Sequence, residues 1–158
     1  MEEAVRGMSG WDGALVTALF AVVVFVAGQI LQRFVLEPIQ EQRRLIGEVA
    51  HALLFYANRG PAGVQLGTFT LEDLRETSRH LRDLAGRLRS SIFYIPLYDT
   101  VARLVDSVPM REDALEAATQ LVGWSNGLYH ERSGPDNSRR RRIIAEKLGI
   151  TKRIGVLE

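Results

Sequence analysis

The sequence contains no cysteine, which excludes a disulfide framework, thiolate metal ligands and catalysis by a cysteine nucleophile. Aromatic residues are sparse, at 8% of the chain. The 20 Lys and Arg residues nearly balance the 19 Asp and Glu residues, so net charge gives no strong overall attraction to nucleic acid. A Walker loop, a GxGxxG string and zinc-ligand spacing are also absent. At 158 residues, the chain is long enough for one small domain and not for two.

The longest apolar run covers residues 13 to 32, GALVTALFAVVVFVAGQILQ, and carries no charge. A helix of that length rises roughly 30 Å, which is the thickness of the hydrocarbon core of a bilayer. Trp11 stands before the run at the place of an interfacial aromatic residue, and the side chain of Arg33 can reach the opposite headgroups. The pattern predicts a membrane-spanning helix, with a buried helix of a soluble protein as an alternative.

A cleavable signal peptide is the other alternative, and the N-terminus argues against it. A signal peptide begins with positive charge, whereas residues 1–12 hold three acidic residues and one arginine, and no A-x-A site follows the run. Basic residues gather on the cytoplasmic side of a span. Arg6 precedes the run, while Arg33, Arg43 and Arg44 follow it. We therefore expect a single-pass protein of the bacterial inner membrane with its N-terminus outside and its C-terminal domain cytoplasmic.

The residues after this run have helical periodicity. From Ile39 to Asn58, apolar residues fall on two sides of a helix, so we expect that helix to lie between neighbours. Residues 59–70 hold three glycines and a proline and predict a loop. Thr70 and Asp73 have the spacing of a capping box, which predicts the start of the next helix.

Prolines mark further boundaries. Pro38 disfavours right-handed helical geometry at Glu37, so we expect the long helix to kink or restart there. We expect Pro96 and Pro109 each to lie at or near the first turn of a new helix.

The C-terminal part predicts two more helices. One runs from Met110 to about Ser125, and a short one runs from Ser138 to Leu148. Between them, residues 134–137 (GPDN) predict a turn. Gly149 is a natural residue to follow the last helix in the left-handed conformation.

No stretch alternates polar and apolar residues long enough to predict a strand. The predicted class is all-α: one N-terminal transmembrane helix followed by a small cytoplasmic bundle of about four to five helices. We expect a short extracytoplasmic N-terminus (1–12), the transmembrane helix (13–36), the helical bundle domain (37–132), and a basic loop, short helix and tail (133–158).

Residues 121–128, LVGWSNGL, contain Gly123-x-Ser125-x-Gly127, the string of a hydrolase nucleophile elbow. That elbow needs a preceding strand, and an acid and a histidine after the serine. Here the preceding residues are helical in pattern, and only His130 follows, with no acid between. We interpret the string as a helix end, with Ser125 in the last turn and Asn126 and Gly127 as residues that tolerate left-handed geometry. Gly123 would allow a neighbouring backbone to approach.

Glu48-x-x-His51 has the spacing of a ligand pair in carboxylate-bridged di-iron sites. Such a site needs a second pair and two further glutamates, and the chain has only three histidines and no second Glu-x-x-His. A mononuclear metal site is a remaining alternative to a histidine packed between helices.

A run of four arginines is the most unusual polar feature. We expect it in the first turn of a helix, where cations oppose the macrodipole, so helix stability does not account for it. Three interpretations remain: a solvated tail, contact with anionic lipid headgroups, or contact with an acidic protein or, less favoured, nucleic acid. The candidate contact residues are Arg139, Arg140, Arg141, Arg142, Lys147, Lys152 and Arg153.

The chain resembles a group of small bacterial single-pass membrane proteins for which no activity is known. The resemblance rests on Glu37-Pro38-Ile39, Glu41-Gln42-Arg43-Arg44, Tyr56-Ala57-Asn58, Ser125-Asn126 and Leu148-Gly149-Ile150. It implies the architecture predicted above and no particular activity.

Taken together, these patterns predict a non-enzymatic, membrane-anchored interaction or scaffolding module that faces the cytoplasm. It would have no catalytic residue, cofactor or metal, and it would bind a protein partner or itself. One alternative is an anionic-lipid or nucleic-acid contact through the arginine run. The other is a metal-dependent enzyme centred near Glu48 and His51.

Overall fold

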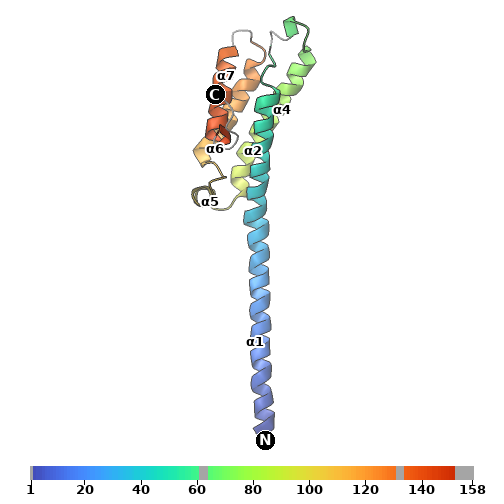
Figure 1. Cartoon of the computed structure of the whole chain (residues 1–158). Coiled ribbons are helices and arrows are strands. Elements are labelled where there is room, and N and C mark those ends of the chain that lie inside the picture. Colours follow the sequence, from blue (N-terminus) through green and yellow to red (C-terminus); the bar gives the residue numbers. More distant parts are fainter. Residues whose placement is uncertain (1, 61–63, 131–133, 152–158) are drawn as a thin grey trace. The chain divides into compact units, whose positions relative to one another are not determined.

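The computed structural model describes residues 2–60, 64–130 and 134–151, which Figure 1 colours from the blue N-terminus to the red helix α7. Every regular element in these ranges is helical, which confirms the predicted all-α class and its long apolar helix followed by a small bundle. The elements are α1 (Glu2–Leu31), the π-helix η1 (Gln32–Leu36), α2 (Glu37–Phe55), α4 (Leu71–Tyr94), α5 (Tyr98–Leu104), α6 (Arg111–Gly127) and α7 (Gly134–Lys147).

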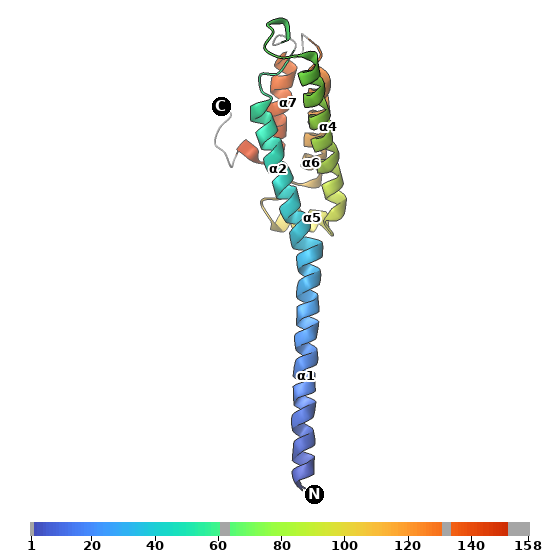
Figure 2. The same ribbon diagram turned by 90° about the vertical axis from the view of Figure 1, so that its right-hand side faces the viewer.

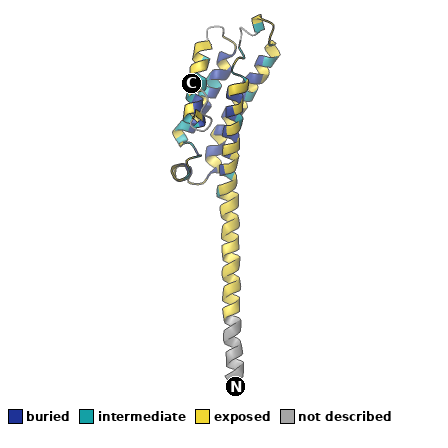
Figure 3. Cartoon of the chain, in the orientation of Figure 1, coloured by how far each residue is buried: buried dark blue, intermediate teal, exposed yellow. Residues whose placement is uncertain are grey.

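The chain divides into two compact units, residues 1–37 and 38–158. The first unit holds the apolar helix. Its most apolar 18-residue window has a mean hydropathy of 2.5, and none of that window is buried. The large apolar side chains from Leu15 to Leu31 are 47% to 69% exposed, and Figure 3 shows this stretch in yellow. By length and composition, this helix can cross a membrane.

A π turn, η1, precedes Pro38. The N–H group of Glu37 bonds to the carbonyl of Gln32, five residues back, and Glu37 has right-handed geometry with φ −61° and ψ −48°. The expectation that Pro38 turns Glu37 away from this geometry is wrong. A proline in an α-helix presses its ring against the carbonyl four residues earlier, here that of Phe34. The wider π turn relieves that crowding, so helical backbone continues into α2.

The second unit is a bundle around one hydrophobic core. α6 packs against α4 on one side and α7 on the other, and one face of α2 joins the same core. Figure 2 shows α2 and α4 running in opposite directions, joined at the end of the bundle opposite α5. Core side chains include Val49, Leu53, Leu81, Leu84, Leu88, Leu121, Trp124 and Ile144. Fully burying each large apolar side chain contributes roughly 1.5–3 kcal/mol to stability.

Only one side of α2 is buried. The expectation that this helix lies between neighbours on both sides is wrong, because His51 is exposed and the side chain of Phe55 is 58% exposed. The rings of His51 and Phe55 pack against each other and not against another helix. His51 stacks on Phe55 at 5.4 Å between ring centroids, and the guanidinium of Arg59 lies 5.3 Å from the Phe55 ring centre. An aromatic ring and a cation thus supply the contacts that were expected from a neighbouring helix.

The start of α4 follows the predicted capping box. The hydroxyl of Thr70 accepts a hydrogen bond from the Asp73 N–H at 3.1 Å, and the Asp73 carboxylate accepts one from the Thr70 N–H at 2.7 Å. These two bonds pair backbone donors that have no partner inside the helix. The Thr70 hydroxyl also donates to the Asp73 carboxylate at 2.7 Å, and this bond, together with the one from the Thr70 N–H, lowers the pKa of Asp73.

The corner between α4 and α5 holds a strained residue. Pro96 and Pro109 each lie one residue before a helix cap, so both stand just outside the first turn. The cap between Pro96 and α5 is Leu97, in the left-handed region with φ 51° and ψ 42°. That geometry costs a non-glycine residue roughly 1–2 kcal/mol. The next residue, Tyr98, is buried and fixes the corner by its hydrogen bonds.

Tyr98 links three parts of the bundle through one hydroxyl group. It accepts a hydrogen bond of 2.6 Å from the side-chain amide of Gln42 on α2, and it donates one of 3.0 Å to the carbonyl of Pro109. Because Gln42 is fully buried near the start of α2, this bond places the α4–α5 corner at the end of the bundle where α2 begins. Burial raises the pKa of the Tyr98 phenol, since the charged form is disfavoured away from water.

Candidate functional site

The Gly-x-Ser-x-Gly string lies inside helix α6. Ser125 is fully buried; its hydroxyl donates to the carbonyl of Val122 at 2.8 Å and accepts from Nε of Arg82 at 3.2 Å. This is a packing position with no strand before it, so the geometry of a nucleophile elbow is not met. Ser125 does lie in the last turn of α6, as predicted. Arg82 from α4 donates to its hydroxyl and, at 2.8 Å, to the side-chain oxygen of Asn126.

The two glycines of the string provide room for side chains of α7. A Cβ atom at Gly123 would meet the guanidinium of Arg140, and one at Gly127 would meet the side-chain amide of Asn137. The predicted left-handed cap at Gly127 is wrong, because Gly127 is the last residue of α6 and the cap residue, Leu128, has right-handed geometry. Close approach of another helix, and not backbone conformation, therefore accounts for both glycines.

Helix α7 begins four residues earlier than predicted. Residues 134–137, which we expected to form a loop, are the first helical turn of α7. At Pro135 a backbone N–H would have no partner inside the helix, so the proline loses no hydrogen bond there. The arginine run therefore lies in the middle of α7, away from the positive N-terminal end that the sequence suggested. Four consecutive helical residues are spread around the helix, so all four cannot share one contact face.

Two of the four arginines bind α6. Nη1 of Arg140 donates to Oε1 of Gln120 at 3.1 Å, and the guanidinium of Arg141 lies 5.9 Å from the ring centre of Trp124. Burial lowers the pKa of Arg141, because the charged form loses water there. Arg139 and Arg142 are exposed. An anion contact would be left with these two side chains, three residues apart on α7.

Of the three remaining candidate cations, Lys147 also pairs with α6. Nζ of Lys147 lies 2.9 Å from Oδ1 of Asp113 and 3.1 Å from Oε2 of Glu116, both on α6. These carboxylates hold the pKa of Lys147 well above its usual range. Lys152 and Arg153 lie outside the described residues. The predicted seven-residue contact thus contains three residues that join α7 to α6, two exposed arginines and two residues beyond the described chain.

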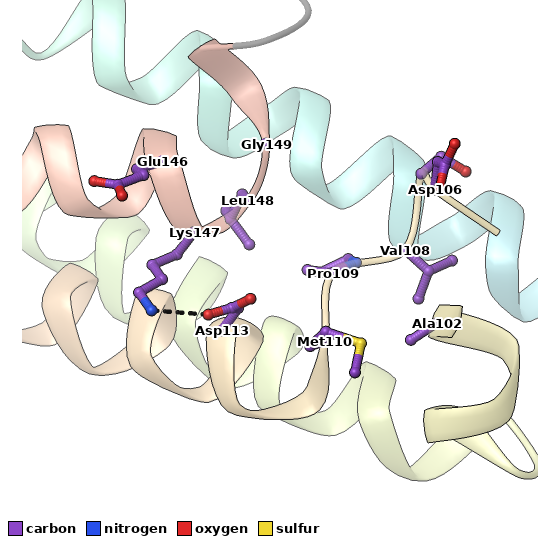
Figure 4. Close-up of a pocket in the computed structure, with 11 residues that line it drawn as sticks. Ala102, Asp106, Val108, Pro109, Met110, Asp113, Glu146, Lys147, Leu148 and Gly149 are labelled. Atoms are coloured by element: carbon purple, nitrogen blue, oxygen red, sulfur yellow. Dashed lines mark hydrogen bonds and ion pairs between the residues drawn. The ribbon is translucent and has the colours of Figure 1, made fainter. Parts of the chain in front are cut away.

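A cleft of about 710 Å³ lies beside Lys147, between the α5–α6 connection and the end of α7. Figure 4 shows its lining residues, with the Lys147–Asp113 ion pair as a dashed line. Buried apolar side chains, Val108 and Leu148, form part of the wall, and the acidic residues Asp106, Asp113 and Glu146 also line it. The cleft therefore combines apolar surface with an excess of carboxylates over its single lysine.

Two features of the cleft shape what it can bind. Gly149 ends α7 in left-handed geometry with φ 66°, as predicted, and so turns the chain along one side of the cleft. The hydroxyl of Ser107 is buried and has no hydrogen-bond partner within the described chain. Carboxylates beside apolar walls suit a segment with both basic and apolar side chains. Sequence reasoning missed this cleft, because residues 106–110 and 146–149 meet only in the fold.

The Glu48 and His51 pair does not converge on a metal position. Both carboxylate oxygens of Glu48 accept hydrogen bonds from Arg87, at 2.7 and 3.3 Å, and this pairing lowers the pKa of Glu48. His51 stacks on Phe55 instead. Among the described side chains of residues 13–60, 64–130 and 134–151, no group of three or more His, Asp or Glu residues is placed to hold a metal ion.

No protein family, curated protein or solved structure matches this chain.

Proposed function

We propose that this protein is a single-pass membrane protein whose small helical domain acts as a non-enzymatic interaction or scaffolding module on the cytoplasmic side. The observation that carries the proposal is the exposed apolar helix. The uncharged run at residues 13–32 includes eleven Leu, Ile, Phe and Val residues, and none of its most apolar window is buried. In a bilayer, these residues contribute about −0.5 kcal/mol each, or about −5 kcal/mol together. In water, the same surface would be a strong aggregation hazard.

Orientation is the second part of the proposal. Arg33, Arg43 and Arg44 follow the apolar run, and Arg6 alone precedes it. Arginines close to the ends of a span determine which side stays in the cytoplasm, whereas carboxylates contribute little. This asymmetry favours a cytoplasmic helical domain.

The interaction role is supported by the way in which the domain uses its polar groups. Ser125, Glu48, Arg140 and Lys147 all have partners inside the bundle, so these groups hold helices together. The cleft beside Lys147 offers a concave surface to a partner. Its apolar walls and acidic side chains favour a protein segment with basic and apolar residues over a nucleic acid, because carboxylates repel phosphates.

Membrane insertion can be tested by alkaline carbonate extraction together with the mass of the intact protein. We expect the full-length chain in the membrane pellet with residues 1–12 still attached. A shorter protein in the soluble fraction would show a signal peptide, and a full-length soluble protein would show a core helix. Alkaline phosphatase fused to the C-terminus should be inactive, and an active fusion would invert the orientation.

Partner binding can be tested by crosslinking the full-length protein in its native membranes. We expect Glu146→Arg, which reverses a charge on the cleft, to abolish the crosslinked product, whether it contains a second protein or a second copy of the chain. Glu76→Arg is the matched control, since Glu76 is an exposed glutamate on α4 away from the cleft. Equal crosslinking by both variants would exclude the cleft, and no product at all would remove support for an interaction module.

A further inference from the structure

The α4–α5 corner exposes large apolar side chains. Phe93 is 82% exposed, Tyr94 72% and Leu97 80%, and all three lie within five residues of the chain. A hollow of about 490 Å³ adjoins Phe93 and Leu97. Single exposed apolar residues are common, but three large ones in one corner form a patch of the kind that contacts a partner or a membrane. We refer to Phe93, Tyr94 and Leu97 as the corner patch.

The backbone of the corner is held in a conformation that exposes Leu97. Leu97 has left-handed geometry, which glycine adopts freely and leucine rarely does. Packing of neighbouring residues maintains it: Ile95 and Tyr98 on either side are 3% and 1% exposed, and Tyr98 is fixed by its bonds to Gln42 and Pro109. A strained residue that presents an apolar side chain to solvent is a feature associated with function, since folding alone would favour glycine there.

The corner patch lies at the end of the bundle nearest in the chain to the apolar helix. Tyr98 bonds directly to Gln42, and Gln42 is only four residues, or about 6 Å of helix, after Pro38, where the bundle begins. The predicted transmembrane helix, residues 13–36, ends two residues before Pro38, and two residues span at most about 7.6 Å. The corner is therefore tethered within a short distance of the segment that we propose crosses the bilayer.

We infer that the corner patch contacts the interfacial layer of the bilayer and so fixes the domain against the membrane surface; this inference rests on the proposed function. The headgroup layer on each side of the hydrocarbon core is about 5–8 Å thick. Gln42 follows the predicted span by six helical residues, a rise of about 9 Å, so the corner lies near the outer edge of this layer. Tyrosine favours this layer, because its ring is apolar and its hydroxyl can remain hydrated. The neighbouring charges of Asp99 and Arg111 pair at 3.1 Å, so they add no net charge beside the patch. The corner patch contacts the lipid interface and not another partner, because the short chain connection to the predicted span keeps it close to that interface.

Single-cysteine spin labelling of the full-length protein tests this contact, and the absence of native cysteine makes every label specific. We would place nitroxide labels by Leu97→Cys, Leu66→Cys and Val23→Cys, in separate samples reconstituted into phosphatidylcholine and phosphatidylglycerol vesicles. Leu66 is the matched control: it is a leucine with 82% exposure, but it lies in the α2–α4 connection at the opposite end of the bundle. Val23 reports on the apolar helix itself.

The labels should differ in their collisions with oxygen, which concentrates in lipid, and with a water-soluble nickel complex. We expect position 97 to show high oxygen and low nickel accessibility, position 66 to show the reverse, and position 23 to lie deepest. Aqueous accessibility at 97 with a deep label at 23 would overturn the inference and leave membrane insertion intact. An aqueous label at 23 would overturn the proposed function itself. An immobilised label at 97 that neither reagent reaches would point to a second copy of the chain in place of lipid.

Discussion

Gly127 provides the sharpest test of how α7 packs against α6. A Cβ at this position would lie 3.0 Å from both Cγ and Nδ2 of Asn137, and closer still to Oδ1. Gly→Ala inside a helix normally adds about 1 kcal/mol of stability, whereas overpacking costs about 1–3 kcal/mol. Asn137 has a short side chain whose oxygen is buried, so it has little freedom to move away. We therefore expect Gly127→Ala to lower the free energy of unfolding by roughly 1 kcal/mol.

Gly123→Ala is the matched control on the same face of α6. The atoms that a Cβ would meet there belong to the guanidinium of Arg140, at the far end of a long side chain that can turn into solvent. Moving it breaks one hydrogen bond to Gln120, worth about 1 kcal/mol, while the helix gains a similar amount from alanine. The net change should be close to zero.

Chemical denaturation of the full-length variants in mild detergent measures these differences, with fluorescence of the buried Trp124 as the probe. Combining Gly127→Ala with Asn137→Ala removes the obstruction and should recover most of the lost stability, because the two changes are coupled. If Gly127→Ala unfolded at the same denaturant concentration as Gly123→Ala, or above wild type, the packing role of Gly127 would be wrong.

Three further perturbations test other contacts. Arg87 lowers the pKa of Glu48, so the ion pair stabilises the fold at neutral pH, and this stabilisation is lost as pH falls below about 4.5. The free energy of unfolding of Glu48→Gln should therefore change less with pH in that acidic range. Denaturation at several pH values measures the difference. Burial raises the pKa of Tyr98, so its neutral phenol stabilises the fold below a pH of about 10, and this stabilisation is lost as pH rises further. Tyr98→Phe should reduce the loss of stability at alkaline pH, although it breaks the hydrogen bond to Pro109. Thr70→Ala should cost about 1 kcal/mol in the same assay, and a neutral effect would contradict the capping role.

Local features were predictable from the sequence because their causes lie within a few residues. The uncharged run at residues 13–32 predicts a long apolar helix by composition alone. Thr70 and Asp73 satisfy each other across three residues, and Gly149 ends α7 because left-handed geometry suits glycine. None of these inferences requires knowledge of which helices are neighbours.

Features that depend on a neighbouring helix were not predictable in this way. Gly127 suits both a helix cap and a close helix contact, and only the position of Asn137 distinguishes them. The arginine run resembled a free cationic surface, because the sequence does not show that Arg140 and Arg141 face α6. Proline is favoured both in loop turns and in the first turn of a helix, so Pro135 did not distinguish them. The predicted start of α7 was therefore four residues too late.

The π turn at residues 32–36 has a consequence for how this chain can change in evolution. Because Glu37 bonds to a carbonyl five residues back, the turn holds one residue more than an α-helical turn would. Deleting a single residue there would restore ordinary α-helical bonding and bring the Pro38 ring against the carbonyl four positions earlier. Descendants of the same ancestor that lack one residue in this turn should therefore also have replaced the proline, so that the gap and the substitution appear together.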